Sequence, residues 1–463
     1  MAELRVPPAS GAIWPVGHIV TLLRDPLAFL SSLANDGSEL VKIRIGPGTA
    51  VVVCDPDLTA RVLRDDRTFD KGGPLFDTAR KVVGDNVITC PHHRHRRQRS
   101  LIQPTFGRAR LTNYGRAMTA EADAMTAAWS HGEVVDMRAS ALRLTTQTVM
   151  ATMFSGALAP HVRDRALADV TDIVNGLYRQ MLAPPLLNRI PTPGNRRYVR
   201  AHARLRELMA HIVADRRIDG TDHGDLVSAM LSARLPADAA ASVDLGDGMT
   251  DSQICDQLMA FFIAGSETTA SALAWALHLL VTHPEVEERL HQETARVLDG
   301  RAARYRDLPD LPLTGHIITE ALRLYPPGWL FTRTVTTDTR LGGYDLPAGT
   351  SVVYSPYILH RRSDLYPNPD RFDPDRWDTP EPPIRRKAFM AFGAGPRRCP
   401  GETFALTELS LALATITGRW RIRHRVGSPT HPAVAMALHP RDLRIRVHSA
   451  RIGGIPPAVE GHR

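Results

Sequence analysis

The chain has 463 residues, of which 43% are hydrophobic and 23% are charged, and its formal net charge is +8. This composition is typical of a globular protein with a large core, and it excludes a disordered or fibrous chain. No basic run is interleaved with aromatic residues, so the positive charge indicates a solvated surface or a basic face for an acidic partner, not a nucleic-acid binder.

The first predicted elements are strands, followed by a long helical part. Residues 40–56 alternate in polarity around a Gly-Pro-Gly turn, which predicts a hairpin. From about residue 101 to 223 the apolar spacing is helical, and RRYVRAHARLRELMAHIVADRR is a clear amphipathic helix. The segment before it, APPLLNRIPTPGN, is a proline-broken connection.

A second set of elements follows from residue 252. Residues 252–282 are apolar nearly all round, which predicts a long helix buried in the middle of a large protein. Residues 341–361 read as a hairpin and a strand, and a proline-rich loop leads on from them. The last clear element is an amphipathic helix in PGETFALTELSLALATI, directly after Cys399.

Nothing in the sequence divides the chain or targets it to a membrane. No repeat or low-complexity segment separates domains, so we expect one domain over residues 1–463, with about residues 1–20 and 450–463 flexible. No apolar run of about 20 residues opens the chain, so neither a signal peptide nor a membrane anchor is expected. No two cysteines form a CxxC pair, so we expect no zinc or iron–sulfur site and a reduced, cytoplasmic protein.

The stretch FMAFGAGPRRCPGE surrounds the single cysteine Cys399 with glycines, prolines and two arginines. Backbone N–H groups and a helix N-terminus stabilise a thiolate, and the glycines allow close backbone approach. Arg397 offers a fork of donors for a carboxylate. A thiolate ligand with an arginine for a propionate suits heme, whereas the alternative is a chance buried cysteine in a turn.

The spacing Phe392-x-x-Gly395-x-Arg397-x-Cys399-x-Gly401 resembles the signature of the heme-thiolate enzymes, the cytochrome P-450 family. The resemblance implies a mainly α fold with smaller β-sheet regions. Heme b (iron protoporphyrin IX) would lie between the long buried helix and the cysteine loop, with Cys399 as the axial iron ligand and the other four motif residues around the heme.

A second motif lies in ITEALRL, where Glu320 and Arg323 are one helical turn apart. Alone, this spacing indicates an ordinary surface ion pair. The resemblance makes them a buried ExxR pair, joined by Arg376 in a structural triad. Asp375 and Trp377 flank this arginine where the family more often has Glu and Phe.

Two further segments carry residues for the heme by resemblance. His95 and Arg99, in HRHRRQRSLIQPTF, are four residues apart on a predicted helix, which alone is typical of a solvated basic face. The resemblance assigns both to the heme propionates, with Arg333 as a third contact. Heme would thus be held by thiolate ligation, charge-assisted hydrogen bonds and apolar burial.

The long buried helix carries the stretch AGSETT. The small Ala264 at its middle leaves room over a flat cofactor. An acid and an alcohol in an apolar helix need partners, and the simplest one for Thr268 is the Ala264 carbonyl. The resemblance implies instead that Glu267 and Thr268 are catalytic and deliver protons to dioxygen, with Thr269 as the alternative to Thr268 in this role.

Apolar residues from several segments form the candidate substrate pocket, which favours a compact apolar substrate. They are Leu75, Phe76, Ile88, Ala260, Phe261, Ala264, Trp329, Leu330, Phe331, Val434, Ala435 and Met436. Stretches such as GPLF, AGSET and GGYDLPAGTSVVYSPY resemble actinobacterial sesquiterpene oxidases of the pentalenene- and albaflavenone-forming kind, which implies a cyclic terpene in secondary metabolism. The cysteine loop is more similar to fatty-acid-type relatives, so fatty-acid and macrolide substrates stay open.

The resemblance implies a monooxygenase that inserts one atom of O2 into a C–H bond. The chain carries no flavin or dinucleotide fingerprint, so a ferredoxin and its NAD(P)H-dependent reductase would supply the electrons. We also expect the protein to be a monomer. We expect an acidic ferredoxin to dock near Arg94, Arg96, Arg97 and Arg398. A peroxygenase, a rearranging enzyme and a heme-based sensor are the alternatives, and the intact acid–alcohol pair argues against the first two.

Overall fold

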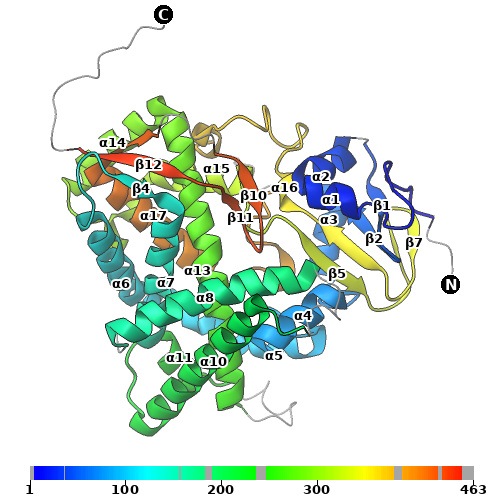
Figure 1. Cartoon of the computed structure of the whole chain (residues 1–463), viewed down its shortest axis with the longest axis horizontal. Helices are drawn as coiled ribbons and strands as arrows, with labels where there is room; N and C mark the ends of the chain where they lie inside the picture. The colour runs from blue at the N-terminus through cyan, green and yellow to red at the C-terminus, as the bar shows by residue number, and fades with distance from the viewer. Residues whose placement is uncertain are drawn as a thin grey trace, which may run out of the picture.

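The computed structural model describes residues 5–35, 37–155, 158–182, 190–235, 247–379, 388–425 and 430–450. Helices form most of it, which confirms the predicted fold class, and the small sheets are spread from β1 and β2 at the right of Figure 1 to β4 and β12 at the upper left. The described helices are α1 (Ile19–Arg24), α2 (Pro26–Asn35), α3 (Pro56–Arg64), α4 (Gly73–Val83), α5 (His92–Ile102), α6 (Arg108–Ala127), α7 (Met137–Phe154), α8 (Pro160–Leu182), α10 (Pro193–Asp219), α11 (Leu226–Ser232), α13 (Asp251–Thr282), α14 (Pro284–Leu298), α15 (Pro312–Leu324), α16 (Pro356–Leu359) and α17 (Glu402–Arg419).

The largest described sheet has the strand order β1-β2-β8-β5-β3 and lies beside α1 and α2 (Figure 1). Its strands are β1 (Leu40–Ile45), β2 (Gly48–Val53), β3 (Phe69–Asp70), β5 (Phe331–Val335) and β8 (Ser351–Tyr354). The predicted hairpin is confirmed, because β1 and β2 pair antiparallel from Leu40↔Val53 to Ile45↔Gly48. Gly46 in the turn has a φ of 58°, a conformation that favours glycine.

The other described strands form three smaller sheets. They are β4 (Val134–Asp136) with β12 (Arg444–Ser449) and β9 (Trp420–His424); β10 (Pro432–Val434) with β11 (Leu438–Pro440); and β6 (Thr339–Leu341) with β7 (Tyr344–Leu346). The hairpin and strand predicted after residue 341 are therefore observed as β6, β7 and β8.

The long helix α13 runs through the middle of the molecule (Figure 1) and is buried along most of its length, as predicted. It begins at a capping box, in which Thr250 accepts from the Gln253 N–H and the Gln253 side chain accepts from the Thr250 N–H. It packs against α7, α10 and α17. No helix among the described residues is long and apolar enough to cross a bilayer.

The structure also contains the two amphipathic helices that the sequence predicts after residue 195 and after Cys399. The amphipathic helix expected after residue 195 is α10, and part of the connection before it, residues 183–189, lies outside the described residues. The helix expected after Cys399 is α17, with Gly401 at its N-cap and Glu402 in its first turn. The cysteine loop (residues 389–401) therefore ends at the start of a helix that packs on α13.

Candidate active site

The cysteine loop is held in a tight backbone turn in front of α17. The Cys399 N–H donates to the Phe392 carbonyl at 2.9 Å, and the Arg398 N–H donates to the Gly395 carbonyl at 3.1 Å. Gly395 has a φ of 67°, and a Cβ built there would lie 2.2 Å from the Leu63 carbonyl oxygen, so the position admits only glycine. These contacts fix the place of the thiol.

The Cys399 side chain is exposed because it opens into a cavity of about 1500 Å³, although protein atoms surround the thiol and screen it from the outer surface. Burial raises the pKa of this thiol, whereas the Gly401 N–H and the charges of Arg99 and Lys71 lower it. The net shift is upward, so a thiolate here requires a further cation, such as a metal ion, against the sulfur.

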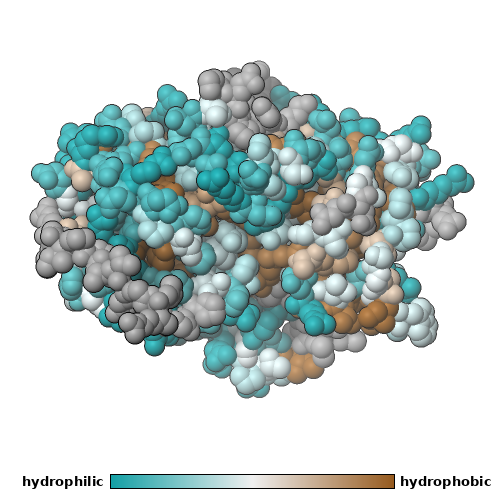
Figure 2. Space-filling model, turned by 90° about the horizontal axis from the view of Figure 1, so that it is seen from above, coloured by the Kyte–Doolittle hydropathy of each residue, from teal (hydrophilic) through white to brown (hydrophobic). Residues whose placement is uncertain are grey.

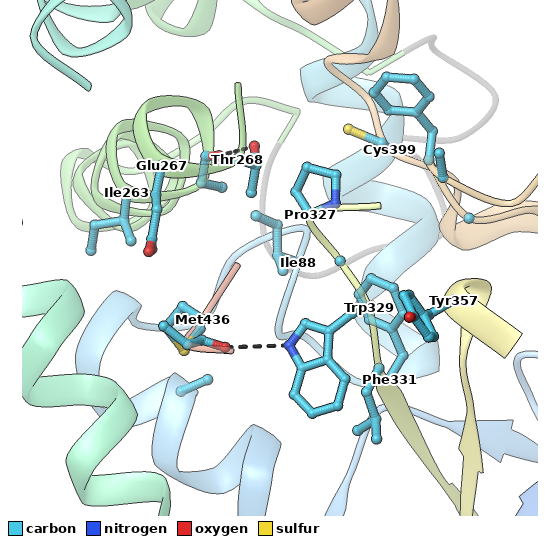
Figure 3. Close-up of a pocket in the computed structure, with 18 of the residues that line it drawn as sticks. Ile88, Ile263, Glu267, Thr268, Pro327, Trp329, Phe331, Tyr357, Cys399 and Met436 are labelled. Atoms are coloured by element: carbon cyan, nitrogen blue, oxygen red, sulfur yellow. Dashed lines mark hydrogen bonds between the residues drawn. The ribbon is translucent and has the colours of Figure 1, made fainter. Parts of the chain in front are cut away.

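The cavity lies between α13, the cysteine loop and the β10–β11 hairpin, as Figure 3 shows for part of its wall. All predicted pocket residues except Leu75 line it, and the side chain of Leu75 lies outside the described residues. Trp329 is fixed in this wall, because its indole N–H donates to the Ala435 carbonyl at 3.3 Å. The predicted pocket segments are therefore brought together around one space.

The acid–alcohol pair lies on the cavity side of α13. The Thr268 hydroxyl donates to the Ala264 carbonyl at 2.7 Å, which is the simplest arrangement considered from the sequence. Figure 3 shows Thr268 on the side of α13 toward Pro327 and Cys399, whereas the Glu267 carboxylate points toward Met436. Burial raises the pKa of Glu267 to about 7, with a small opposing effect of Arg138.

Several basic side chains line the same cavity near the cysteine loop. Arg333 is buried, and its Nε has no hydrogen-bond partner among the described residues. Burial lowers the pKa of His95 to about 3, so this imidazole is a neutral donor or acceptor at physiological pH. Arg99 donates to the Arg398 carbonyl. Lys71, which was not singled out from the sequence, donates from Nζ to the Ile88 carbonyl at 2.7 Å.

Arg397 lines the cavity as well, but protein groups already hold its guanidinium. Its Nε and one terminal nitrogen donate to the carboxylates of Asp66 and Asp70 at 2.8 and 2.9 Å, and the other terminal nitrogen donates to the Cys90 carbonyl at 2.8 Å. Burial alone would raise the pKa of Asp66, but the hydrogen bonds from Arg397 and His92 lower it overall. Arg397 thus ties the cysteine loop to the segment after α3.

The predicted triad is formed away from the cavity. Glu320 and Arg323 are both fully buried, and Arg323 donates to the two oxygens of Glu320 at 2.8 and 2.9 Å. Arg376 donates to Glu320 Oε1 at 2.9 Å, and the Trp377 indole N–H donates to Oε2 at 2.9 Å. Trp377 therefore adds a hydrogen bond to this carboxylate that a phenylalanine would lack.

The arginines expected to meet a ferredoxin are partly neutralised. Arg94 pairs with Asp85, and Arg398 pairs with Glu402 at 2.5 Å. Arg97 donates to the Gly248 carbonyl at 2.5 Å. Arg96 is exposed on α5. The positive electrostatic potential around these four arginines is therefore weaker than it would be if none of them were paired with a carboxylate.

The residues around the cavity fit a heme. Its volume exceeds the roughly 300–1,000 Å³ typical of a small-molecule site, which leaves space for a flat cofactor and a substrate. Arg333 is a buried cation that needs an anion, and heme carries two propionates. Desolvation lowers the pKa of Lys71 well below its usual value, and an anion beside this amine would favour its charged form. The Cys399 thiol needs a cation against its sulfur, and heme carries iron.

A family model described as "Cytochrome P450" matches residues 7–444 of this chain. The chain is 43% identical over 449 residues to a pentalenene oxygenase of Streptomyces avermitilis, an alignment that covers 96% of this chain and 98% of that one. It is 41% identical over 417 residues to a cyclooctat-9-en-7-ol 5-monooxygenase of Streptomyces melanosporofaciens, covering 90% and 89%. It is 42% identical over 441 residues to a cyclooctatin synthase of the same organism, covering 94% of each chain.

Proposed function

The chain belongs to the cytochrome P450 family, and from that premise we propose that this monooxygenase acts on a cyclic terpene. The names of its relatives, pentalenene oxygenase and cyclooctat-9-en-7-ol 5-monooxygenase, support a terpenoid substrate. The single observation that carries the proposal is the apolar part of the cavity wall around Ile88, Phe261 and Met436, since the lining basic residues Arg333, Lys71 and Arg99 would face the heme.

The reaction consumes the substrate C–H bond, O2, two electrons and two protons, and yields the alcohol and water. A ferredoxin reduced by an NAD(P)H-dependent reductase supplies the electrons. Heme, when bound through a cysteine thiolate, supplies the activation of dioxygen and the cleavage of its O–O bond.

Cys399 would hold the heme iron, and Arg333, His95, Arg99 and Lys71 would hold its propionates. Arg397 is largely neutralised by its two carboxylate partners, so its main contribution is to position the cysteine loop. Phe392, Gly401 and Ala264 line the cavity and would shape the space around the ring, the last from the α13 side, whereas Gly395 does not line it and would act by allowing the tight turn of the cysteine loop.

Glu267 and Thr268 would manage protons at the α13 side of the cavity. Because burial raises the pKa of Glu267 to about 7, this carboxyl exchanges a proton readily near neutral pH. The Thr268 proton is committed to the Ala264 carbonyl, so the hydroxyl oxygen offers its lone pairs to the cavity and would hold a water there.

The test has two stages. The difference spectrum of the reduced, carbon monoxide-bound protein tests for a heme-thiolate centre, and Cys399→Ser should abolish it. Turnover with a ferredoxin and reductase, a panel of cyclic sesquiterpenes, cyclic diterpenes and fatty acids, and 18O2 then tests the substrate. Labelled terpene alcohols support the proposal, whereas oxidation of fatty acids alone, or turnover only with hydrogen peroxide, contradicts it.

We propose heme b as the cofactor, a monomer, and a location in the cytoplasm. A heme-based sensor, the non-enzymatic alternative, would give the thiolate spectrum without product.

A further inference from the structure

One part of the cavity wall, residues 84–91 between α4 and α5, belongs to no helix or strand, and we call it the wall segment. Its residues Val87, Ile88 and Thr89 line the cavity. Figure 3 shows the side chain of Ile88 projecting into the space that Thr268 also lines. A side chain on an irregular segment keeps a fixed place only if specific contacts hold its backbone. The place of Ile88 therefore depends on what holds the wall segment.

Two side chains of the long helix α13 hold the backbone of the wall segment. The Val87 N–H donates to Gln257 Oε1 at 3.1 Å, and the Asp85 N–H donates to Asp256 Oδ2 at 3.0 Å. The partners are 170 and 171 residues apart in the chain, so these contacts form only in the folded protein. Two N–H groups of the segment are thus fixed to consecutive residues of one helix.

The hydrogen bonds of Gln257 close into a ring through Gln98 of α5. Gln257 Nε2 donates to Gln98 Oε1 at 3.1 Å, and Gln98 Nε2 donates to the Asp85 carbonyl at 3.2 Å. Hydrophilic side chains such as those that cover much of the face in Figure 2 bond to water, whereas Gln257 and Gln98 are buried. Because a buried amide without partners costs free energy, the ring favours one arrangement of the wall segment.

Asp256 fixes the start of the wall segment and also contacts α10. Gly84 has a φ of 72°, and a Cβ built there would overlap the carboxylate of Asp256, so the position admits only glycine. Asp256 Oδ1 forms an ion pair of 2.7 Å with Arg206 of α10. His202 of the same helix lies 2.6 Å, through Nε2, from the Val82 carbonyl near the end of α4. The start of the segment is therefore held between α13 and α10.

One face of α13 carries both these contacts and the alcohol of the acid–alcohol pair. Gln257 and Thr268 are eleven residues apart, which is about three helical turns, so both lie on one face, about 16 Å apart along the axis. Phe261 and Ala264 lie between them on this face and line the cavity. A continuous helix thus sets the place of Ile88 relative to Thr268.

We propose that Gln257 and Asp256 are positioning residues that fix Ile88 in the cavity and so determine which ligands it accepts. Neither side chain lines the cavity, so both act through the wall segment. For a substrate, the same contacts determine which of its C–H bonds lies toward Cys399. That consequence rests on the proposed function, whereas the position of the wall segment does not, so the test uses no turnover.

The first measurement is amide hydrogen exchange over residues 84–91 of the heme-loaded, full-length protein, followed by mass spectrometry. Gln257→Leu has a similar volume but loses both hydrogen bonds, so the segment should exchange about tenfold faster than in the wild type. Gln257→Glu, which is protonated when buried, keeps an acceptor and a donor and should restore slow exchange.

Thr145→Val is the matched control for a lost buried hydrogen bond to α13. The Thr145 hydroxyl donates to the Ser266 carbonyl at 2.7 Å and does not contact the wall segment. This variant should exchange over residues 84–91 as the wild type does.

The second measurement follows the shape of the cavity through two heme ligands, imidazole and 4-phenylimidazole. Both bind iron through a ring nitrogen, and the phenyl group adds contact with the cavity wall. The ratio of their dissociation constants should change about threefold or more in Gln257→Leu and in Ile88→Ala. Gln257→Leu should add little to the change in the Ile88→Ala background, because it acts through Ile88. The Thr145→Val control should leave the ratio unchanged.

Unchanged exchange in Gln257→Leu, an unchanged ligand ratio in either variant, or effects of Gln257→Leu and Ile88→Ala that simply add would each overturn the proposal. If Gln257→Leu does not fold, Gln98→Leu breaks the same ring from α5 and is measured in its place with the same expectations. A protein that oxidises no terpene but passes both measurements would refute the proposed function and leave this inference standing.

Discussion

The main-chain N–H of Met390 donates a hydrogen bond of 2.9 Å to Nε2 of His360. Nδ1 of the same ring lies 3.0 Å from the Arg323 carbonyl, so His360 must be the neutral tautomer with the proton on Nδ1. Its ring stacks on Phe389, with centroids 5.3 Å apart. One buried imidazole thus connects the ExxR pair to the start of the cysteine loop.

This arrangement predicts a loss of stability in acid. Burial lowers the pKa of folded His360 to about 3, against about 6.5 in the unfolded chain. Between these values the unfolded state binds a proton that the folded state does not, so the free energy of unfolding falls as the pH drops below about 6.5. One such group contributes up to about 1.4 kcal/mol per pH unit. Urea unfolding from pH 7.5 to pH 4.5 measures the slope.

His360→Gln is the matched variant, because its amide oxygen retains an acceptor for the Met390 N–H but does not titrate. The variant should lose stability more gradually with falling pH than the wild type. Parallel slopes for the two proteins would rule out His360 as a contributor.

The ExxR triad should be essential for folding. Glu320→Gln removes the negative charge against Arg323, which is fully buried. An uncompensated buried charge costs about 3–5 kcal/mol. Asp375→Asn is the control, since Asp375 pairs with Arg289 at the surface, and exposed pairs contribute at most about 1 kcal/mol. Urea unfolding of both variants measures the difference, and a Glu320→Gln protein as stable as the control would show that the triad is dispensable.

The sequence predicted those parts of the site that depend on local spacing. The β1–β2 hairpin, the burial of α13 and the helix start after Cys399 each follow from a few neighbouring residues, whose periodicity and turn chemistry act locally. The Glu320–Arg323 pair also lies within one helical turn.

Local spacing does not predict which residues far apart in the chain contact each other in the fold. Arg397 meets Asp66 and Asp70 across more than half of the chain, and nothing in its own loop indicates those partners. Trp377 stands where the family more often has Phe, and its neighbours in the sequence do not indicate its hydrogen bond to Glu320. Lys71 gave one weak signal, as one of only four lysines in the chain.

Substitution of Arg333 should weaken heme binding more than it lowers the stability of the fold. Its guanidinium is buried, and its Nε is unsatisfied among the described residues, so an anionic group bound against it would gain a charge-assisted hydrogen bond. Arg333→Leu should therefore speed heme transfer to an excess of apomyoglobin by about tenfold or more, since hydrogen bonds to charged groups contribute about 1.5–3 kcal/mol. Arg340→Leu, at an exposed arginine of β6, is the control. Equal transfer rates in the two variants would remove Arg333 from the heme site.

Reduction by a ferredoxin should depend moderately on salt. Arg94 and Arg398 are already paired with carboxylates, so Arg96 on α5 is expected to contribute much of the remaining positive field. Stopped-flow reduction rates should fall as ionic strength rises, and Arg96→Gln should slow reduction at low salt. The distant Arg340→Gln should not. Rates that are insensitive to both salt and Arg96→Gln would place the docking surface elsewhere.

Thr268 should govern how efficiently electrons are used, with little effect on substrate affinity. Its hydroxyl donates to the Ala264 carbonyl and presents its oxygen to the cavity, where it would hold a water in the proton path from Glu267. Thr268→Val keeps the shape of the side chain and removes the hydroxyl, so reducing equivalents should be diverted to hydrogen peroxide. Positioned proton-transfer groups contribute about 10²–10⁴-fold. The loss should lie at or below the low end of that range, because Thr269 also lines the cavity.

The measurement is product formed per NAD(P)H consumed with saturating electron donors, alongside the dissociation constant of the substrate. Thr268→Ser restores the hydroxyl and should recover most of the ratio, whereas Thr269→Val should change it less than Thr268→Val does. If the ratio is unchanged in Thr268→Val, the hydroxyl serves only to satisfy the Ala264 carbonyl within α13. If Thr269→Val has the larger effect, the water is held by the neighbouring threonine, which is buried and also lines the cavity, whereas Thr268 is exposed to the cavity.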